Sequence, residues 1–322
     1  MADPNDGQIV TEAWEAYVNQ DPTDNIFARH ALLEELRSNG SFEKQNGRSV
    51  FHILEYAQNS TVKWMSEYET LDVTAQTTFD QCEFAWKLIG GDVPMSEFEK
   101  AITAAGAGKF DLMAKKLDNL KSTIEETVNT ACFSDGTGTA GKEVGGLQEL
   151  VQTTPSTGTT GQISRDSFSF WRNQQQTGTK TSTAYDNLRA HMGLIYDACS
   201  NGVGKENPTF AVTTSTIFAA FNNLLVANER YGRKGAGDKG VSGFKGQNIM
   251  FRDIPLFYDA ACASASVYIL NNRNLHLVYA VWMKGFPAVS PTNQFVDVFK
   301  VLSICAMTSD NLRRLGVVNA IT

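Results

Sequence analysis

The clearest pattern in the chain is an alternation of apolar and polar residues in two stretches between residues 48 and 93. This period of two runs through 61–64 and again through 81–88, and it is typical of β-strands with one apolar face. The residues between, 68–78, are rich in threonine and acidic side chains, which favours polar turns. We therefore expect long extended strands joined by polar turns.

This predicted ribbon lacks a core of its own. A two-stranded ribbon is marginal by itself in water, and no core-forming helix is woven into residues 48–93. Its apolar face must therefore lie against something else, and another subunit is one natural candidate. The large apolar residues expected at such subunit contacts are Val62, Trp64, Phe84, Trp86 and Leu88.

The longest helical pattern follows the ribbon. Ser96 is a good N-cap, and Glu99 stands where it completes a capping box. From residue 110 onward apolar residues recur at steps of three and four, which predicts a helix up to about Cys132. Gly106 and Gly108 are expected to kink its first part. At ~1.5 Å per residue the helix spans roughly 50 Å, so it suits a spine-like role as well as that of an ordinary core helix.

Shorter elements fill the rest of the chain. Apolar spacing and stop signals predict helices over about 28–38, 183–200 and 216–231. Strands are expected at 209–213, 248–252, 255–258, 267–270 and 275–281, with the last two joined as a hairpin around 271–274. An apolar stretch, 295–306, precedes a basic segment, 311–315. Strands and helices in this mixed order predict an α+β protein with mainly antiparallel sheets.

Composition and charge narrow the classes of function. The chain has 322 residues, a formal net charge of -7 and a sequence pI of about 5.2. A protein that grips a phosphate backbone normally clusters Lys and Arg, and the richest basic stretch here, 230–245, is diluted by glycines. A sequence-specific reader of nucleic acid is therefore disfavoured, whereas a container that encloses nucleic acid is still allowed.

The sequence also bears on the cellular compartment in which the protein is made. The first ten residues are acidic and polar, without the basic and apolar regions of a signal peptide. No apolar run approaches the ~18 residues that span a bilayer. The five cysteines are scattered, as expected of small apolar residues in a reducing compartment. We expect a protein made in the cytoplasm, with no membrane partner.

Candidate chemistry is sparse. Residues 136–143, GTGTAGKE, fit a phosphate-binding loop except at the last place, where Glu143 replaces the Ser or Thr that holds magnesium. A helix also precedes this segment where a strand is required, so a flexible connector is the simpler interpretation. The four histidines lack the spacing of a helical zinc motif. We therefore expect no catalytic, cofactor-binding or metal-binding residues, although a catalytic set assembled only in space stays open.

The order of several short segments resembles a known family. They are YETLDVT (68–74), FAWK (84–87), FSDGTG (133–138), GGL (145–147), FSFWRN (168–173), FRDIPL (251–256), VYILN (267–271) and NLRRLGV (311–317). With the long helix from Ser96, this order is similar to that in the major capsid proteins of tailed bacteriophages, the Hong Kong ninety-seven type. The resemblance covers about residue 48 to the C-terminus.

The resemblance implies an anatomy. It assigns 1–47 to an N-terminal arm, 48–94 to an extended E-loop over a neighbouring subunit, 95–134 to the spine helix of a peripheral domain, 135–266 to an axial domain, and 267–322 to a return to the peripheral sheet. It also implies hexamers and pentamers that close into an icosahedral virion shell around double-stranded DNA, assembled in the bacterial host cytoplasm.

Further partners and two alternatives follow from the same comparison. The segment before residue 48 is short for a built-in scaffold, so a separate scaffolding protein is expected, together with a portal. No cofactor is implied. One alternative is an encapsulin-like nanocompartment shell of the same fold, and the other is a nucleotide-binding enzyme that uses the loop at Lys142.

Overall fold

The computed structural model describes residues 30–99, 101, 112–178, 187–200, 207–226, 249–252 and 254–321. These residues divide into two compact units. Unit 1 contains Leu88–Val128 and Val281–Ile304, and unit 2 contains Arg29–Lys87, Asn129–Ala280 and Cys305–Thr322. Within the described part of the chain, no helix is both long and apolar enough to cross a bilayer.

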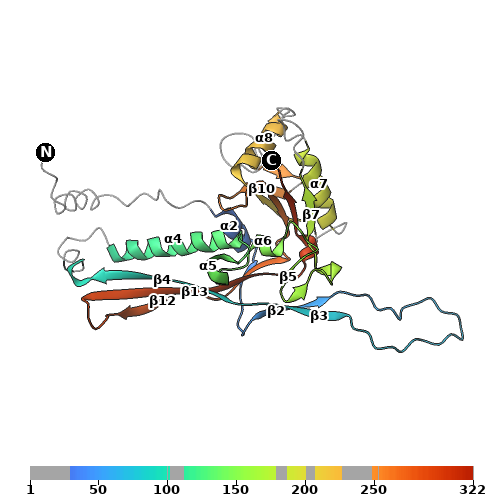
Figure 1. Cartoon of the computed structure of the whole chain (residues 1–322), viewed down its shortest axis with the longest axis horizontal. Coiled ribbons are helices and arrows are strands. Elements are labelled where there is room, and N and C mark those ends of the chain that lie inside the picture. Colours follow the sequence, from blue (N-terminus) through green and yellow to red (C-terminus); the bar gives the residue numbers. More distant parts are fainter. Residues whose placement is uncertain are drawn as a thin grey trace, which may run out of the picture. The chain divides into compact units, whose positions relative to one another are not determined.

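A six-stranded mixed sheet is the centre of unit 2 (Figure 1). Its strands, in spatial order, are β7 (Gln174–Thr177), β14 (Gly316–Asn319), β11 (Val267–Leu270), β8 (Phe210–Thr213), β10 (Ile254–Tyr258) and β9 (Ile249–Phe251). Every residue of β8 and β11 is buried, so these two strands are covered on both faces. This continuous burial explains their runs of apolar residues without alternation.

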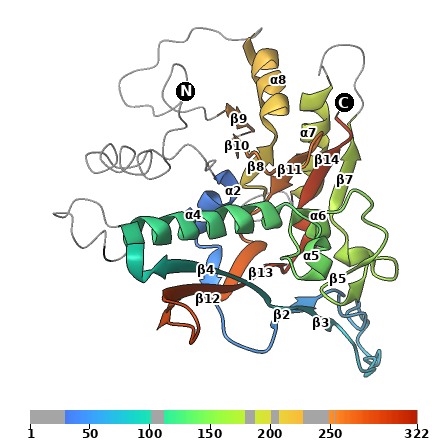
Figure 2. The same ribbon diagram turned by 60° about the vertical axis from the view of Figure 1, so that its left-hand side comes forward.

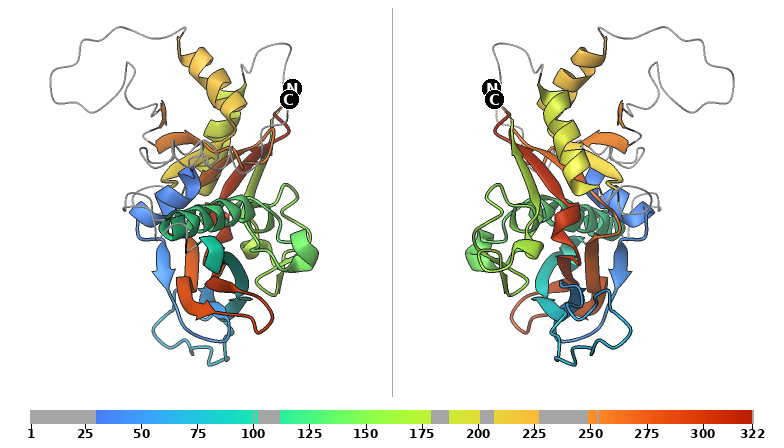
Figure 3. Two further views of the ribbon diagram at one scale, coloured as in Figure 1. Left: turned by 90° about the vertical axis from the view of Figure 1, so that its left-hand side faces the viewer. Right: turned by 90° about the vertical axis from the view of Figure 1, so that its right-hand side faces the viewer.

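Two helices cover one face of this sheet. They are α7 (Leu188–Cys199) and α8 (Ser215–Val226), shown beside the sheet in Figures 2 and 3. Met192 of α7 and Phe221 of α8 belong to the same buried cluster as Val267 and Ile269 of β11. Because residues two apart on a strand point to the same face, both helices pack on one side of the sheet.

Smaller elements complete unit 2. The helix α2 (Ala31–Ser38) buries Leu32, Leu33 and Leu36 and precedes β1 (Phe42–Lys44), which pairs in parallel with the first residues of β12. The hairpin of β2 (Val50–Glu55) and β3 (Phe79–Phe84) forms a two-stranded sheet. The remaining short elements are α5 (Gly138–Gly141), α6 (Leu147–Leu150), β5 (Thr159–Thr160), β6 (Ile163–Ser164), η1 (Ser169–Trp171) and η2 (Leu312–Arg314).

Unit 1 is built from long strands and a helix. Its strands are β4 (Lys87–Ser96), β12 (Leu275–Val289) and β13 (Val296–Ser309), with β13 between the other two, and its helix is α4 (Leu112–Cys132). Parts of β12, β13 and α4 continue into unit 2. A Cβ atom on Gly91 of β4 would lie 2.5 Å from Leu120 Cδ1 of α4, so a larger residue at this position would require the end of the Leu120 side chain to shift.

Several predicted elements agree with the structure. The helices expected at 28–38, 183–200 and 216–231 are present as α2, α7 and α8, and the strands expected at 209–213 and 255–258 are β8 and β10. The predicted long helix is described from Leu112, which gives α4 a length of about 32 Å over its 21 residues. The expected kink at Gly106 and Gly108 and the basic stretch 230–245 lie outside the described residues.

Three predictions about the strands are wrong. Residues 56–78 form an extended loop, so Val62 and Trp64 do not lie on a strand. The alternation over 81–88 belongs to two strands in different sheets, since β3 ends at Phe84 and β4 begins at Lys87. The strands β11 and β12 do not form a hairpin, because β8 and β14 already occupy both sides of β11.

The last finding also moves a predicted boundary. The resemblance assigns 267–322 to a return to the peripheral sheet, but β11 and β14 both belong to the six-stranded sheet that contains β8. The turn after β11 is closed by Asn274 N–H donating to Asn271 O at 3.1 Å, and the chain enters the other sheet only with β12.

Candidate functional site: the hairpin β2–β3 and its loop

The hairpin β2–β3 has one buried and one exposed face. The register pairs Val50 with Phe84 and His52 with Cys82, so these residues share a face, which is covered by the rest of unit 2. The other face carries Phe51, Ile53 and Phe79, whose side chains are 62%, 73% and 62% exposed. The exposed face of the hairpin therefore presents three large apolar side chains to water, beside the polar residues Glu55, Gln81 and Glu83. Exposed apolar groups of this size are typical of a surface that another molecule covers.

Specific contacts fix the root of the hairpin to unit 2. His52 Nε2 lies 3.1 Å from Thr308 Oγ1, and Glu83 N–H donates to Gly161 O at 3.0 Å. Gln162 Nε2 donates to the Glu83 carboxylate at 3.0 Å. These bonds hold the hairpin from both of its strands, so its exposed face is presented in a defined orientation within unit 2.

The loop 56–78 continues the hairpin (Figure 1). Its ends are joined by Tyr56 N–H donating to Thr78 O at 3.0 Å, and Ser60 Oγ donates to Gln76 Oε1 at 2.8 Å further along. At its far end Lys63 Nζ and Glu69 Oε1 form an ion pair at 2.6 Å, which holds the pKa of the Glu69 carboxyl below its usual range. These polar contacts order the loop without any apolar core.

The apolar side chains of this loop are left in water. Trp64 is fully exposed and Val73 is 94% exposed. Val62, Met65, Tyr68 and Leu71 are also exposed. A loop with this many exposed large apolar side chains indicates a surface that another molecule covers.

The structure separates the five predicted contact residues. Val62, Trp64 and Leu88 are exposed, and Trp86 is half-buried, with its indole N–H donating to Gly47 O at 3.0 Å. Phe84 does not fit the prediction, because only 7% of its surface is exposed and its own subunit already covers it. A buried side chain has almost no area to offer to a neighbour.

Sequence reasoning missed the outward residues of the hairpin. Phe51, Ile53 and Phe79 lie on the exposed face, yet the stretch VFHILE places apolar residues on both faces of β2. The sequence signal of a half-buried strand is an alternation with one polar face, and this segment does not show it. The pairing of β2 with β3 is what reveals which side faces outward.

Unit 1 presents a second set of exposed aromatic residues. Phe98, which follows β4, is 75% exposed, and Phe295, which precedes β13, is 88% exposed. The two segments are linked by Glu97 N–H donating to Phe295 O at 3.1 Å. This end of unit 1 is a further surface suited to contact with another molecule.

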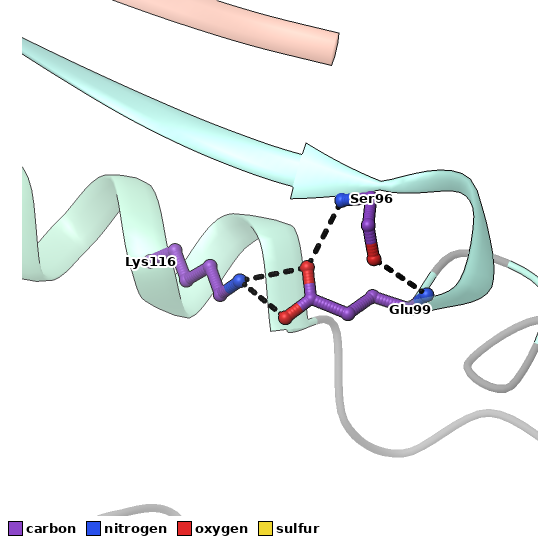
Figure 4. A network of polar contacts seen from close by, with 3 residues as sticks. All are labelled: Ser96, Glu99 and Lys116. Carbon is purple, nitrogen blue, oxygen red and sulfur yellow. Dashed lines mark hydrogen bonds and ion pairs between the residues drawn. The ribbon is translucent and has the colours of Figure 1, made fainter. Parts of the chain in front are cut away.

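The predicted capping box at this end of unit 1 is confirmed (Figure 4). Ser96 Oγ accepts from Glu99 N–H at 3.1 Å, and the Glu99 carboxylate accepts from Ser96 N–H at 3.1 Å. Lys116 Nζ of α4 lies 2.9 Å and 3.0 Å from the two carboxylate oxygens. The hydrogen bond from Lys116 is the main cause that lowers the pKa of Glu99 from its usual 4.5.

Replacing Ser96 with Ala should lower the free energy of unfolding by about 1 kcal/mol, because the N–H of Glu99 loses its acceptor. Since the folded state depresses the pKa of Glu99, the contribution of this network is complete at neutral pH and is lost as the pH falls below about 4.5. Urea unfolding at neutral pH and again below about pH 4.5 measures the free energy that the network contributes at each pH. The control is Ser156→Ala at an exposed position; an equal loss in both variants contradicts the assignment.

The phosphate-loop-like segment has no arrangement suited to a nucleotide. It follows α4, not a strand, and Thr139 Oγ1 donates to Glu143 Oε1 at 2.7 Å. Gly141 O accepts from Lys87 Nζ. The backbone oxygen and the Glu143 carboxylate would both repel a phosphate, so this segment is a closed connector.

Groups for metal or thiol chemistry are also not assembled in the described ranges. No group of three or more His, Cys, Asp or Glu side chains is placed to hold a metal ion there. All five cysteines are buried, and burial raises the pKa of the Cys82 thiol to about 11 and that of Cys199 to about 12. Such thiols are poor nucleophiles at neutral pH.

Known structures share this arrangement of elements. The capsid of cyanophage A-1(L) matches with a TM-score of 0.74 at 17% identity, over 94% of this chain and 96% of that chain. The capsid of Myoviridae phage XM1 matches with 0.57 at 11% identity, over 93% and 94%. The SrpI encapsulin of Synechococcus elongatus PCC 7942 matches with 0.57 at 11% identity, over 95% and 94%. No protein-family model and no curated protein sequence matches the chain.

These matches define the class of fold. The chain has the α+β fold of tailed-phage capsid proteins, the Hong Kong ninety-seven type, over almost its whole length. The predicted fold class and the family resemblance are confirmed at this level. The three matched structures belong to protein shells, and the same fold occurs in a phage capsid and in an encapsulin.

Proposed function

We propose that this chain is a structural shell subunit, the major capsid protein of a tailed bacteriophage, and has no enzymatic role. The observation that carries the proposal is the loop 56–78 with the exposed face of β2–β3, which leaves apolar side chains such as Trp64 and Ile53 in water. Burial of apolar surface on another copy is favourable by ~25 cal/mol per Å². The fold shared with capsids supports the same conclusion.

The assembly that we propose is a closed icosahedral head made of hexamers and pentamers. In a closed shell, each subunit both covers a neighbour and is covered by another, so many weak contacts add up. The loop 56–78 is the segment that crosses to a neighbouring subunit. A separate scaffolding protein and a portal are the further partners of this assembly, which forms in the host cytoplasm and becomes part of the virion.

The proposed content of the shell is double-stranded DNA, held without sequence-specific contacts. The formal net charge of -7 supports enclosure over gripping, since a phosphate-binding surface requires clustered Lys and Arg. Counterions can neutralise the packaged DNA instead.

The second candidate is an encapsulin-like compartment, and the match to the SrpI encapsulin favours it specifically. The contents of particles purified from nuclease-treated cell lysates distinguish the two candidates. A phage head should contain nuclease-protected DNA, whereas a compartment should be small, free of DNA and loaded with a second protein. Protein cargo without DNA would overturn the phage assignment and leave the shell assignment in place.

Replacing Trp64 with Ser should leave a soluble, folded subunit but impair assembly. The side chain is fully exposed, so its loss removes no packing within the subunit. A Trp buries about 150–250 Å² at a contact, which at ~25 cal/mol per Å² corresponds to about 4–6 kcal/mol for each contact. Sedimentation velocity measures the fraction of protein in shells.

The matched control is Trp64→Phe, which keeps most of the apolar area and should retain most of the assembled fraction. Unfolding by urea should be the same for both variants and for the native chain. If Trp64→Ser assembles as well as the native chain, the loop 56–78 is not a subunit contact.

A further inference from the structure

Two histidines meet at the root of the hairpin β2–β3. His52 of β2 and His276 of β12 stack with ring centroids 5.9 Å apart and an interplanar angle of 27°. Both belong to unit 2, and His52 lies on the buried face of the hairpin, opposite Cys82 in the register. The ring pair is therefore part of the contact between the hairpin and the body of unit 2.

The environment of this pair disfavours a second positive charge. Stacked imidazole rings attract one another when neutral, and two imidazolium ions at this separation repel. His276 Nδ1 is buried and, among the described residues, has no hydrogen-bond partner. At this nitrogen, His276 is therefore held by the stacking of its ring and not by a hydrogen bond.

Other titratable groups face the ring of His52 from each neighbouring element. Burial, and then His276, lower the pKa of His52, while Asp310 after β13 and Glu43 of β1 act in the opposite direction. Asp310 also accepts from Asn274 Nδ2 at 2.8 Å. Cys82 of β3 contacts the backbone of His52 through its thiol at 3.8 Å. Burial and His276 outweigh the two carboxylates, so the pKa of His52 is lowered and the docked hairpin holds His52 uncharged at neutral pH.

We propose that His52 and His276 form a pH-sensitive contact that holds the hairpin β2–β3 against unit 2 at neutral pH and releases it in mild acid. Its consequence for assembly rests on the proposed function, because the hairpin carries the loop 56–78. The contact itself is a property of the single subunit. In a shell, acid release at this root would loosen the loop that crosses to the neighbour.

The direction of the effect follows from proton linkage. A released hairpin returns His52 to water, where its pKa regains the usual 6.5. The released form therefore binds a proton more readily than the docked form, and release becomes more favourable as the pH falls below about 6.5. One proton taken up on release changes the equilibrium by at most about tenfold per pH unit.

Cys82 gives a direct readout of release in the unassembled subunit. Cys82 is fully buried on the inner face of the hairpin, and its thiol lies 3.9 Å from Ser309 O. A dipyridyl disulfide, which reacts with thiols in mild acid, should label Cys82 faster at about pH 5.5 than at about pH 7.5, by up to about tenfold per pH unit for one proton. Peptide mapping separates Cys82 from Cys199, the last residue of α7, which is buried in the core between this helix and the sheet. The labelling of Cys199 should not show the same rise in acid.

Two variants and one independent measurement complete the test. His52→Gln should abolish the pH step in Cys82 labelling, whereas His191→Gln, on α7, should keep it. If His52→Gln does not fold, the native chain still tests the inference, because its four histidines give four ring signals in an NMR titration. The signal of His52 should report a pKa below the usual 6.5 of a histidine.

Three results overturn the inference: equal pH dependence at Cys82 and Cys199, a step that survives in His52→Gln, or a His52 signal that titrates at or above the usual value. These outcomes are independent of shell formation, which electron microscopy reports separately. A labelling step without shells refutes the proposed function alone, and shells without a labelling step refute the pH-sensitive contact alone.

Discussion

Asp259→Ala should lower the free energy of unfolding by about 3–5 kcal/mol and loosen the helix α2. The Asp259 side chain is only 2% exposed and accepts from Asn129 Nδ2 at 3.1 and 3.2 Å, from Ala261 N–H at 2.9 Å and from Leu32 N–H at 3.4 Å. Removing the carboxylate leaves three buried or half-buried donors without an acceptor, each at a cost of about 1–3 kcal/mol.

The bond to Leu32 explains why α2 should respond first. The N-cap residue of α2, His30, makes no side-chain hydrogen bond to the helix. The carboxylate of Asp259 takes that role from a position 227 residues away and also complements the positive end of the helix dipole. Hydrogen exchange of residues 31–38 should therefore accelerate more than that of α7.

Two variants define the origin of this loss. Asp259→Asn keeps the shape but removes the charge and one acceptor, so it should cost less than Asp259→Ala. Asp166→Ala removes an exposed carboxylate and should change the free energy of unfolding by less than about 0.5 kcal/mol. Equal effects of Asp259→Ala and Asp166→Ala in urea unfolding would show that Asp259 does not join these elements.

Arg165→Met should be the second severe change, with a loss of about 3–5 kcal/mol in the free energy of unfolding. Arg165 is fully buried and donates to Thr160 Oγ1 at 2.9 Å, Asn173 Oδ1 at 2.7 Å, Glu149 O at 3.0 Å and Leu150 O at 2.7 Å. Burial lowers the pKa of its guanidinium to about 10, so the side chain still carries its charge at neutral pH.

The effect of Arg165→Met should concentrate in residues 147–173. Methionine fills the space with apolar atoms but offers no donor, so two backbone carbonyls and two side-chain oxygens lose this partner in a buried site. Trp171, whose indole N–H donates to Thr160 O at 2.9 Å, should become more accessible to a fluorescence quencher.

The matched control for this change is Arg189→Met, because Arg189 is exposed on α7. It should leave both the urea midpoint and the quenching of Trp171 close to those of the native chain. A small loss in Arg165→Met, equal to that of the control, would mean that the carbonyls near Arg165 find other donors and that the guanidinium is not the organising group.

The features that the sequence predicts well are the local ones. The capping box of Ser96 and Glu99 is visible three residues apart, and both of its hydrogen bonds are present. The faces of α2 and α7 follow from steps of three and four, and their apolar residues are buried as expected. Such patterns are set by residues close together in one helix, so they can be predicted without knowing which other elements the helix packs against.

The errors have a common physical cause, which is pairing over long distances along the chain. The alternation at Val62 and Trp64 lies in a loop, since these residues pair with no strand in the part of the chain that the structure describes. The expected hairpin after β11 fails because β8 and β14 flank that strand. Likewise, Phe84 belongs to the predicted alternating pattern but faces inward. Its pairing with Val50 places both residues on the buried face of the hairpin.

The candidate site was therefore predicted only in part. The exposed residues Val62, Trp64 and Leu88 agree with a contact role that is still a proposal, whereas the outward face of Phe51, Ile53 and Phe79 was not predicted. The stacked pair of His52 and His276 brings together residues 224 positions apart. No spacing rule within one segment can indicate such a pair.

Cryo-electron microscopy of the purified full-length chain, over a range of protein and salt concentrations, tests the central claim most directly. The account predicts closed shells or rings of subunits in which the loop 56–78 of one copy lies on the next copy and Trp64 is covered. A protein that stays monomeric under every condition, or shells in which this loop touches no neighbour, would contradict it.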